Sequence, residues 1–291
     1  MQLLPTQIIM DDVSNGVVNN VKYNIAPPNS VELAVNFVFN EIYGEAVVRK
    51  GITIVGAALN AASNPIAGIH YFANSAGTIS RLIAVAQGGS NNIIYYYNGT
   101  SWVAALSTDT AGQKTRFETF LDYVVRVNGV DSIVTSNTGT SWTQNTALND
   151  SSFPAGAKFV KAYKAQLTAA GATSRPDSLY VSSTPNAGGT AISWTSGNRE
   201  IVINPQDGQN ITGLGVVGGV EVVFKDRSMY RWNNRSTDAD PVVSVGCSSQ
   251  ESVVNCGNGL LAFFNPKGIY LTSGEQPVLI SRRVQKWIDG M

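Results

Sequence analysis

Acidic, arginine and tyrosine side chains are the groups in this sequence that could perform hydrolysis. A glycosidase needs two carboxylates in contrasting environments, and a sialidase also needs clustered arginines with a tyrosine nucleophile. Arginines recur at positions 227, 231 and 235, but in a stretch of strand and loop, so they need not face together. The one adjacent acidic pair, Asp11-Asp12, lies in a polar N-terminal stretch. The other acids stand singly, among them Glu118, Asp122, Asp131, Asp177, Glu200, Asp207, Glu221 and Asp226. We therefore expect a non-enzymatic protein.

Metal, nucleotide and redox chemistry have equally little support. His70 is the single histidine and the chain has no CxxC pair, so we expect no metal and no cofactor. Gly213–Gly219 (GLGVVGG) has the glycines of a phosphate loop without its Lys-Ser/Thr ending, and reads as a glycine-rich inner strand. Cys247 and Cys256 lie nine residues apart, so they either face each other across a hairpin or remain reduced thiols.

The basic residues provide the remaining candidate chemistry, which is contact with nucleic acid. Twenty Lys and Arg balance twenty Asp and Glu, so the sequence has no general electrostatic footprint for DNA. One stretch is locally basic, and its side chains either line a channel for DNA or form a solvated edge: Lys158, Lys161, Lys164 and Arg175.

Composition favours a subunit of an assembly. Charged residues make up 14% of the chain, below the roughly 25% of an average soluble domain. Two explanations fit so weakly charged a surface: partners cover much of it, or Ser, Thr, Asn and Gln side chains provide its solvation. No segment approaches the ~20 continuous apolar residues of a membrane span, and the first residues lack the pattern of a secretory signal.

The elements that must position these residues are short strands in a repeat of roughly forty residues. Apolar strand patterns alternate with Gly and Asn turns, and an aromatic anchor recurs at intervals of roughly 40, 52, 38 and 38 residues. The anchors are Trp102, Trp142, Trp194, Trp232 and Tyr270. Such a period predicts an all-β fold, a β-propeller of five to six blades.

Three regions follow from this pattern. Residues 1–30 are polar and read as an extended N-terminal arm, residues 31–281 as the β-propeller, and residues 282–291 as a short C-terminal helix. Two strands predicted in residues 31–56 either form most of a sixth blade or close the ring against the last blade.

Two turns resemble the aspartate boxes of sialidase-type propellers. They are NGTSW at Asn98–Trp102 and TGTSW at Thr138–Trp142, with Asn137 near the aspartate position of the second. Because this turn is structural even in sialidases, the resemblance implies a propeller and not a hydrolase.

The two ends of the chain resemble tailed-phage structural propellers. The first stretch, AVNFVFNEIYGEAVVRKGITIVG, carries Asn36, Asn40 or Glu41, Gly44 and Arg49-Lys50-Gly51 in the order of that family. The closing stretch carries, in order before a terminal helix, Gly246-Cys247, Ser252-Val253-Val254, Gly268-Ile269-Tyr270 and Ile280-Ser281.

The resemblance implies a virion structural protein that forms a homo-oligomeric ring in the head-to-tail or tail-nozzle region of a short-tailed phage. It implies portal, adaptor, tail or fibre proteins as partners, non-specific contact with packaged DNA, and assembly in the host cytoplasm. An adaptor or a peripheral decoration stays open. The alternative is a carbohydrate-binding or sialidase-like propeller that acts on a host surface glycan.

Overall fold

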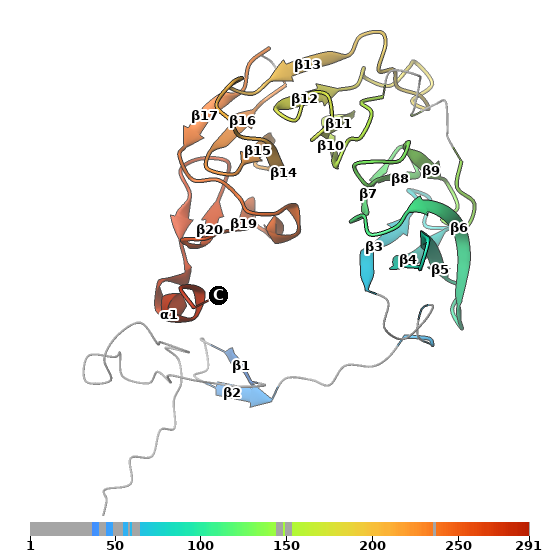
Figure 1. Ribbon diagram of the computed structural model, residues 1–291, viewed down its shortest axis with the longest axis horizontal. Coiled ribbons are helices and arrows are strands. Elements are labelled where there is room, and N and C mark those ends of the chain that lie inside the picture. The colour runs from blue at the N-terminus through green and yellow to red at the C-terminus, as the bar shows by residue number, and fades with distance from the viewer. Residues whose placement is uncertain are drawn as a thin grey trace, which may run out of the picture. The chain divides into compact units, whose positions relative to one another are not determined.

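The computed structural model describes residues 37–40, 45–48, 55–57, 59, 65–143, 148, 153–234 and 237–290 (Figure 1). The predicted arm, residues 1–30, and the family-like residues Asn36, Gly44, Arg49, Lys50 and Gly51 lie outside this part of the chain. The chain divides into two compact units. The smaller unit contains Met1–Thr53, Asn265–Leu271 and Val278–Met291, and the larger contains Ile54–Phe264 and Thr272–Pro277.

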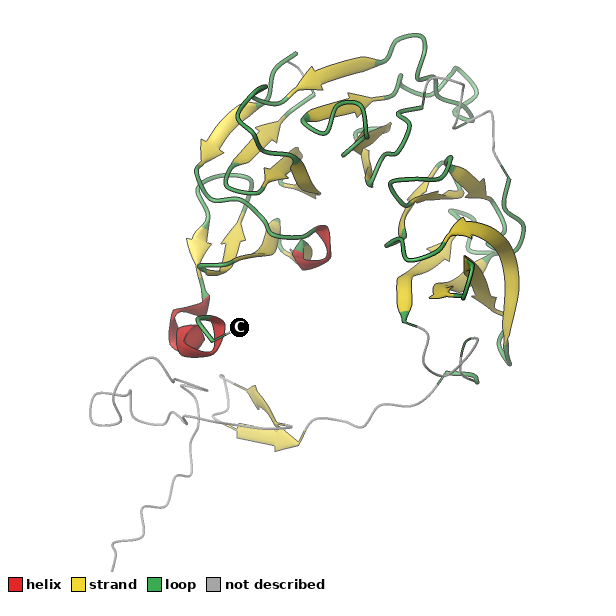
Figure 2. Cartoon of the chain, in the orientation of Figure 1, coloured by secondary structure: helices red, strands yellow, loops and turns green. Residues whose placement is uncertain are grey.

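Among the described residues, most of the regular secondary structure consists of antiparallel strands, which are yellow in Figure 2. In the smaller unit β1 (Phe37–Asn40) pairs with β2 (Glu45–Val48). Helix within the described residues is confined to three short segments: η1 (Gln250–Ser252), η2 (Ser281–Val284) and α1 (Gln285–Ile288). No helix in the described ranges is long and apolar enough to cross a membrane. The all-β prediction is confirmed.

The larger part of the chain forms five successive sheets, and in each of them the strand order follows the sequence. This meander is the topology of one propeller blade. The first sheet contains β3 (Ile66–Ala73), β4 (Ser80–Gln87), β5 (Asn91–Tyr97) and β6 (Trp102–Thr110). The second contains β7 (Arg116–Phe120), β8 (Tyr123–Val127) and β9 (Val134–Ser136), and Thr143 adds an isolated antiparallel bridge to Thr135.

The remaining three sheets each have four strands. The third contains β10 (Phe159–Tyr163), β11 (Gln166–Ala170), β12 (Ser178–Val181) and β13 (Arg199–Val202). The fourth contains β14 (Ile211–Val217), β15 (Val220–Lys225), β16 (Met229–Trp232) and β17 (Asp240–Val243). The fifth contains β18 (Val254–Gly257), β19 (Leu260–Asn265), β20 (Gly268–Thr272) and β21 (Val278–Leu279).

The hairpin between the first and second strands is the most regular feature of the repeat. In sheets two to five it is a two-residue turn with both residues in the left-handed region, the geometry that suits the twist of paired strands. The four turns are Leu121-Asp122, Lys164-Ala165, Gly218-Gly219 and Asn258-Gly259. The predicted single inner strand over GLGVVGG is therefore wrong, because its last two glycines form the turn that separates β14 from β15.

The core lies between successive sheets. Buried side chains of the first and second sheets, such as Phe72, Ile94 and Val124, form one cluster. Two further clusters join the second sheet to the third and the third to the fourth, and Phe224 meets Phe263 at a centroid distance of 4.8 Å between the fourth and fifth. The first strands also contact one another in order: β3 with β7, β7 with β10, β10 with β14, and β14 with β18. The first strands thus lie together at one edge of the sheets.

Candidate functional site

Equivalent positions on the first strands line one groove. The residues two positions before the end of β7, β10, β14 and β18 all line a cavity of about 170 Å³: Glu118, Lys161, Gly215 and Asn255. The residues four positions before the end of β3, β7 and β10, which are Ile69, Arg116 and Phe159, line a cavity of about 540 Å³ together with Val253, the residue before β18. The two cavities share Lys161, Gln250 and Val253, so we treat them together as the inner-strand groove.

Ion pairs between different sheets cross this groove. Lys161 Nζ on β10 donates to Glu118 Oε2 on β7 at 2.8 Å. Arg116 Nη2 on β7 donates to Glu251 Oε1 on η1 at 2.6 Å, and Lys114 Nζ lies 3.5 Å from the other oxygen of Glu251. Burial raises the pKa of Glu251, but a hydrogen bond from Ser249 and the charges of Arg116 and Lys114 outweigh it and hold that pKa at about 2. Glu251 is therefore an anion throughout the physiological range.

A third carboxyl group lies behind the groove in a different protonation state. Glu221 on β15 is fully buried, and its Oε1 accepts a hydrogen bond of 2.6 Å from Thr168 Oγ1. Burial raises its pKa to about 8, and the charge of Glu118 adds to that shift while Thr168 and Lys161 oppose it. Glu221 is thus largely a neutral acid at neutral pH.

His70 on β3 lies at the same edge of the sheets. Its Nε2 is 2.9 Å from Thr119 Oγ1, and its ring stacks on Phe117 with centroids 5.7 Å apart. Burial and, to a smaller extent, the positive charge of Lys161 together lower its pKa to about 4. His70 is therefore neutral at physiological pH.

The segment η1 fixes the groove at its fifth-sheet side. Gln250 Oε1 accepts a 2.6 Å hydrogen bond from Leu214 N, and its Nε2 donates to Leu214 O at 2.9 Å. The side-chain amide thus pairs with the edge of β14 as a neighbouring backbone would. Gly213 permits this approach, since a Cβ there would lie 3.2 Å from Gln250 Oε1.

The carboxyl groups of this arrangement differ in their access to solvent. Glu118 and Glu221 have contrasting environments, the pattern expected of an acid and a base. A substrate cannot reach Glu221, however, because none of its surface is exposed. Within the described ranges no group of three His, Cys, Asp or Glu side chains is placed to hold a metal ion.

The structure separates the four predicted channel-lining basic residues. Only Lys161 lines the inner-strand groove. Lys158 packs its side chain against Gly129 and Gly171. Lys164 lies in the β10–β11 turn and donates to Asn233 O at 2.9 Å, and Arg175 is 3.0 Å from Glu200. Whether any of them contacts DNA stays a prediction.

The aromatic anchors occupy different positions in their repeats. Trp102 begins the fourth strand of the first sheet and Trp142 precedes the matching bridge of the second. Trp194 lies in the connection between β12 and β13, whereas Trp232 and Tyr270 lie on third strands. The forty-residue interval therefore marks the sheets but not one equivalent residue.

The two predicted aspartate-box-like turns are closed by different side chains. In the first, Asn98 Oδ1 accepts hydrogen bonds from Thr100 N and Ser101 N. In the second, Ser136 Oγ accepts from Gly139 N at 2.8 Å, while Asn137 is exposed. The expected role of Asn137 is thus taken by the preceding serine.

The closing family-like residues form contacts with one another. Cys247 N donates to Lys225 O at 3.0 Å, and its sulfur lies 3.2 Å from Ser252 Oγ. A Cβ at Gly246 would lie 2.1 Å from Lys225 O, so only glycine fits there. Within the smaller unit, Ser281 Oγ accepts from Ile269 N at 3.0 Å, and Ile280 N donates to Ile269 O at 2.9 Å.

The two cysteines do not form a disulfide. Cys247 is a buried free thiol and Cys256 an exposed one. Burial raises the pKa of the Cys247 thiol, which keeps it protonated and unreactive. The sequence left open whether the two cysteines pair across a hairpin or remain reduced, and in this structure both are reduced thiols.

The sequence did not indicate that Glu118, Lys161 and Gln250 would line one groove with Glu221 buried behind it. Glu118 and Lys161 occupy the same position relative to their hairpins, so alignment of the repeats on those turns would have paired them. Of the four residues in the turns Leu121-Asp122 and Lys164-Ala165, only Asp122 is of a type that favours turns.

No protein-family model matches the chain, and no curated protein matches it. Among solved structures it is similar to YCF48 bound to D1 peptide, at 13% identity and a TM-score of 0.44 over 69% of this chain and 64% of that one. It is also similar to YCF48 from Cyanidioschyzon merolae (12%, TM-score 0.49, 73% and 68%) and BamB from Moraxella catarrhalis (11%, TM-score 0.44, 76% and 63%). The chain thus spans about two thirds of the length of these structures. Likeness at this level assigns no role to the chain.

Proposed function

We propose that this chain is a β-propeller of five to six blades that serves as a non-enzymatic structural protein of a tailed-phage virion. It would form a ring in the head-to-tail or tail-nozzle region, around the channel through which DNA leaves. Portal, adaptor, tail or fibre proteins would be its neighbours. The ordered set of family-like motifs at the two ends of the chain carries this proposal.

The contacts among the closing motifs support it. Cys247 N donates a hydrogen bond to Lys225 O at the end of β15, and the Cys247 sulfur contacts Ser252 Oγ. Ser281 Oγ accepts a hydrogen bond from Ile269 N near the start of β20. These residues therefore help to determine how the last sheet is completed. The successive meanders with cores between them support the propeller.

The chemistry of the inner-strand groove supports the absence of catalysis. Its two accessible carboxylates, Glu118 and Glu251, are each held by a cation from a neighbouring strand. A carboxylate committed to an ion pair is a poor nucleophile and a poor base. The role of these ion pairs would therefore be structural: they link β7 to β10 and to η1.

Location in particles tests the proposal. An antibody raised against the purified chain should label tailed particles from the source lysate at the junction between head and tail, and a particle reconstruction should place the chain there. Particles that lack the chain by mass spectrometry, or release of sugar from glycans by the purified protein, would overturn it.

Deletion of residues 1–30 tests the predicted arm separately. We expect the truncated chain to keep its circular dichroism spectrum and thermal transition but to be absent from particles, because an extended arm can add a strand to a neighbour's sheet. Normal incorporation of the truncated chain would refute the role of the arm.

A further inference from the structure

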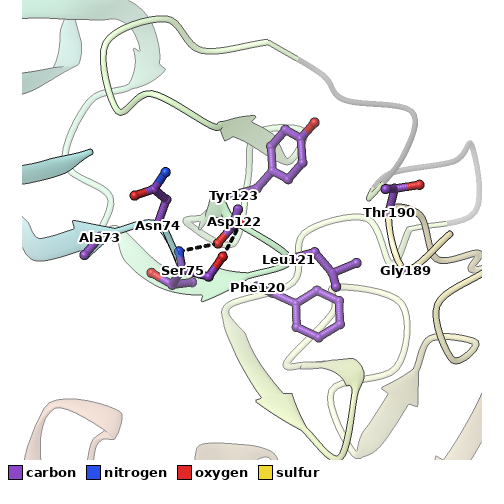
Figure 3. Close-up of a pocket in the computed structure, with 10 residues that line it drawn as sticks. Ala73, Asn74, Ser75, Phe120, Leu121, Asp122, Tyr123, Gly189 and Thr190 are labelled. Atoms are coloured by element: carbon purple, nitrogen blue, oxygen red, sulfur yellow. Dashed lines mark hydrogen bonds between the residues drawn. The ribbon is translucent and has the colours of Figure 1, made fainter. Parts of the chain in front are cut away.

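A second cavity lies at the opposite ends of the first strands, away from the inner-strand groove. Its volume is about 600 Å³, within the range of small-molecule sites. It is open to solvent, and three loops border it: the β3–β4 turn at Ala73–Ser75, the β7–β8 hairpin at Thr119–Tyr123, and Gly189-Thr190 in the connection from β12 to β13. Figure 3 shows Phe120 and Leu121 between Ser75 on one side and Thr190 on the other.

The cavity combines an apolar floor with an oriented carboxylate. Phe120 is buried, and Leu121 and Tyr123 are half-buried beside it. Asp122 Oδ1 accepts from Ser75 N at 2.7 Å and Asp122 Oδ2 from Ser75 Oγ at 2.8 Å (Figure 3). These two hydrogen bonds lower the pKa of Asp122, which is therefore ionised. No Lys, Arg or His in the described part of the chain forms an ion pair with Asp122, in contrast to Glu118 and Glu251.

The backbone at this carboxylate is held in a conformation that its residues rarely adopt. Leu121 has φ +49° and Asp122 φ +61°. A non-glycine residue there costs on the order of 1–3 kcal/mol, and a leucine is a genuine outlier. The equivalent turn of the fourth sheet, Gly218-Gly219, avoids that cost, whereas the turn of the third sheet, Lys164-Ala165, also places two non-glycine residues in this region. The second sheet thus retains an apolar and an acidic side chain where glycine would fold more easily.

From this geometry we infer that the cavity is a binding site for a neutral saccharide. An ionised carboxylate with spare lone pairs accepts hydrogen bonds from two sugar hydroxyls, and an aromatic and aliphatic floor covers the apolar face of a pyranose ring. Hydroxyl groups of Thr190 and Tyr123 at the rim can both donate and accept. The fixed negative charge of Asp122 disfavours an anionic sugar such as a sialic acid.

The site would give the chain a second role, attachment to a surface glycan, independent of its place in a particle. Its location on three adjacent loops fits this role, since loops held by a rigid scaffold commonly carry binding residues. The inference does not depend on the phage assignment, because it rests only on the cavity.

Ligand-observed NMR with the purified chain tests the site. The probes are the methyl glycosides of glucose, galactose, mannose, N-acetylglucosamine and N-acetylgalactosamine, with N-acetylneuraminic acid as the anionic comparison, each at millimolar concentration. We expect saturation transfer to at least one neutral probe and none to the anionic sugar. No transfer to any neutral probe, or equal transfer to the anionic one, overturns the inference.

Asp122→Asn is the decisive variant. Asparagine tolerates the left-handed region and keeps an acceptor for Ser75 N, so the turn should fold as before. We expect affinity for the neutral probe to fall at least tenfold. Asp226→Asn, at an exposed acid outside the cavity, is the matched control and should leave the affinity unchanged. Unchanged affinity in Asp122→Asn, with the same chemical shifts elsewhere, overturns the inference.

Discussion

Replacement of Glu221 by glutamine should make the stability of this protein less dependent on pH. The folded chain ionises Glu221 near pH 8, whereas the unfolded chain ionises it at its ordinary value of 4.5. Between these values the folded state binds a proton that the unfolded state has lost, so the free energy of unfolding falls as pH rises. The stabilisation is complete below about pH 4.5 and is lost as pH rises through 8.

The size of the effect follows from the shift. Each pKa unit corresponds to about 1.4 kcal/mol, so a shift from 4.5 to about 8 amounts to roughly 5 kcal/mol between the two limits. Glutamine has nearly the same volume, keeps an oxygen for Thr168 Oγ1, and does not ionise. The variant should therefore match the wild type near pH 5 and become more stable than it by a few kcal/mol near pH 9.

Urea unfolding followed by tryptophan fluorescence at several pH values measures this difference directly. Groups that do not interact with Glu221 titrate alike in both proteins, so their contributions cancel when the two curves are subtracted. Glu275→Gln, which removes an exposed partner of Arg231, is the control and should change the free energy of unfolding by less than about 1 kcal/mol. If the difference in the free energy of unfolding between wild type and Glu221→Gln stays constant from pH 5 to pH 9, the conclusion that Glu221 is a neutral acid in the folded state is wrong.

Three further perturbations probe other parts of the same structure. His70 is the single histidine, so its NMR titration is unambiguous; it should occur near pH 4, and Lys161→Gln should move it upward because a nearby positive charge is removed. A titration of His70 that Lys161→Gln leaves unchanged would contradict their proximity. Arg126→Met leaves the buried carboxylate of Asp109 unpaired and should cost about 3–5 kcal/mol in urea unfolding; a loss under 1 kcal/mol would contradict the buried pair. Gly246→Ala places a methyl group against a backbone oxygen and should lower the melting temperature by several degrees, whereas Gly89→Ala meets open space and should not.

The strands of the first sheet were predictable because their turns contain the residues that turns prefer. Asn98 Oδ1 accepts hydrogen bonds from the backbone N–H groups of Thr100 and Ser101, the two residues that follow Gly99. Such a hydrogen bond is the reason that asparagine in a sequence predicts a turn. The alternation of apolar residues then gives strand positions close to those observed for β3 to β6. Local chemistry and local structure agree in this sheet.

The hairpins of the second and third sheets were not predictable, because contacts distant in sequence hold them. The turn at Leu121-Asp122 is fixed by Ser75, which is 47 residues from Asp122. The turn at Lys164-Ala165 is fixed in part by the bond from Lys164 to Asn233 O, 69 residues away. Tertiary structure overrides local propensity at both turns.

The same two turns explain why the inner-strand groove escaped prediction. A strand's register decides which residues share a face, and register in a hairpin is set by its turn. Without the turns, Glu118 and Lys161 read as isolated charges on separate strands. Once the turns are known, the two residues fall at matching positions and their pairing follows.

The pairing of these charges would determine how strongly the groove attracts DNA in the proposed ring. Lys114, Arg116 and Lys161 face Glu118 and Glu251, which leaves one positive charge in excess when Glu221 is neutral. Each phosphate that a protein neutralises contributes a slope of about −0.9 to the dependence of log affinity on log salt. A groove with one excess positive charge would therefore attract the DNA backbone only weakly and without regard to sequence. Weak, uniform attraction suits a channel that DNA must leave, because a groove of unpaired lysines would hold the DNA inside it.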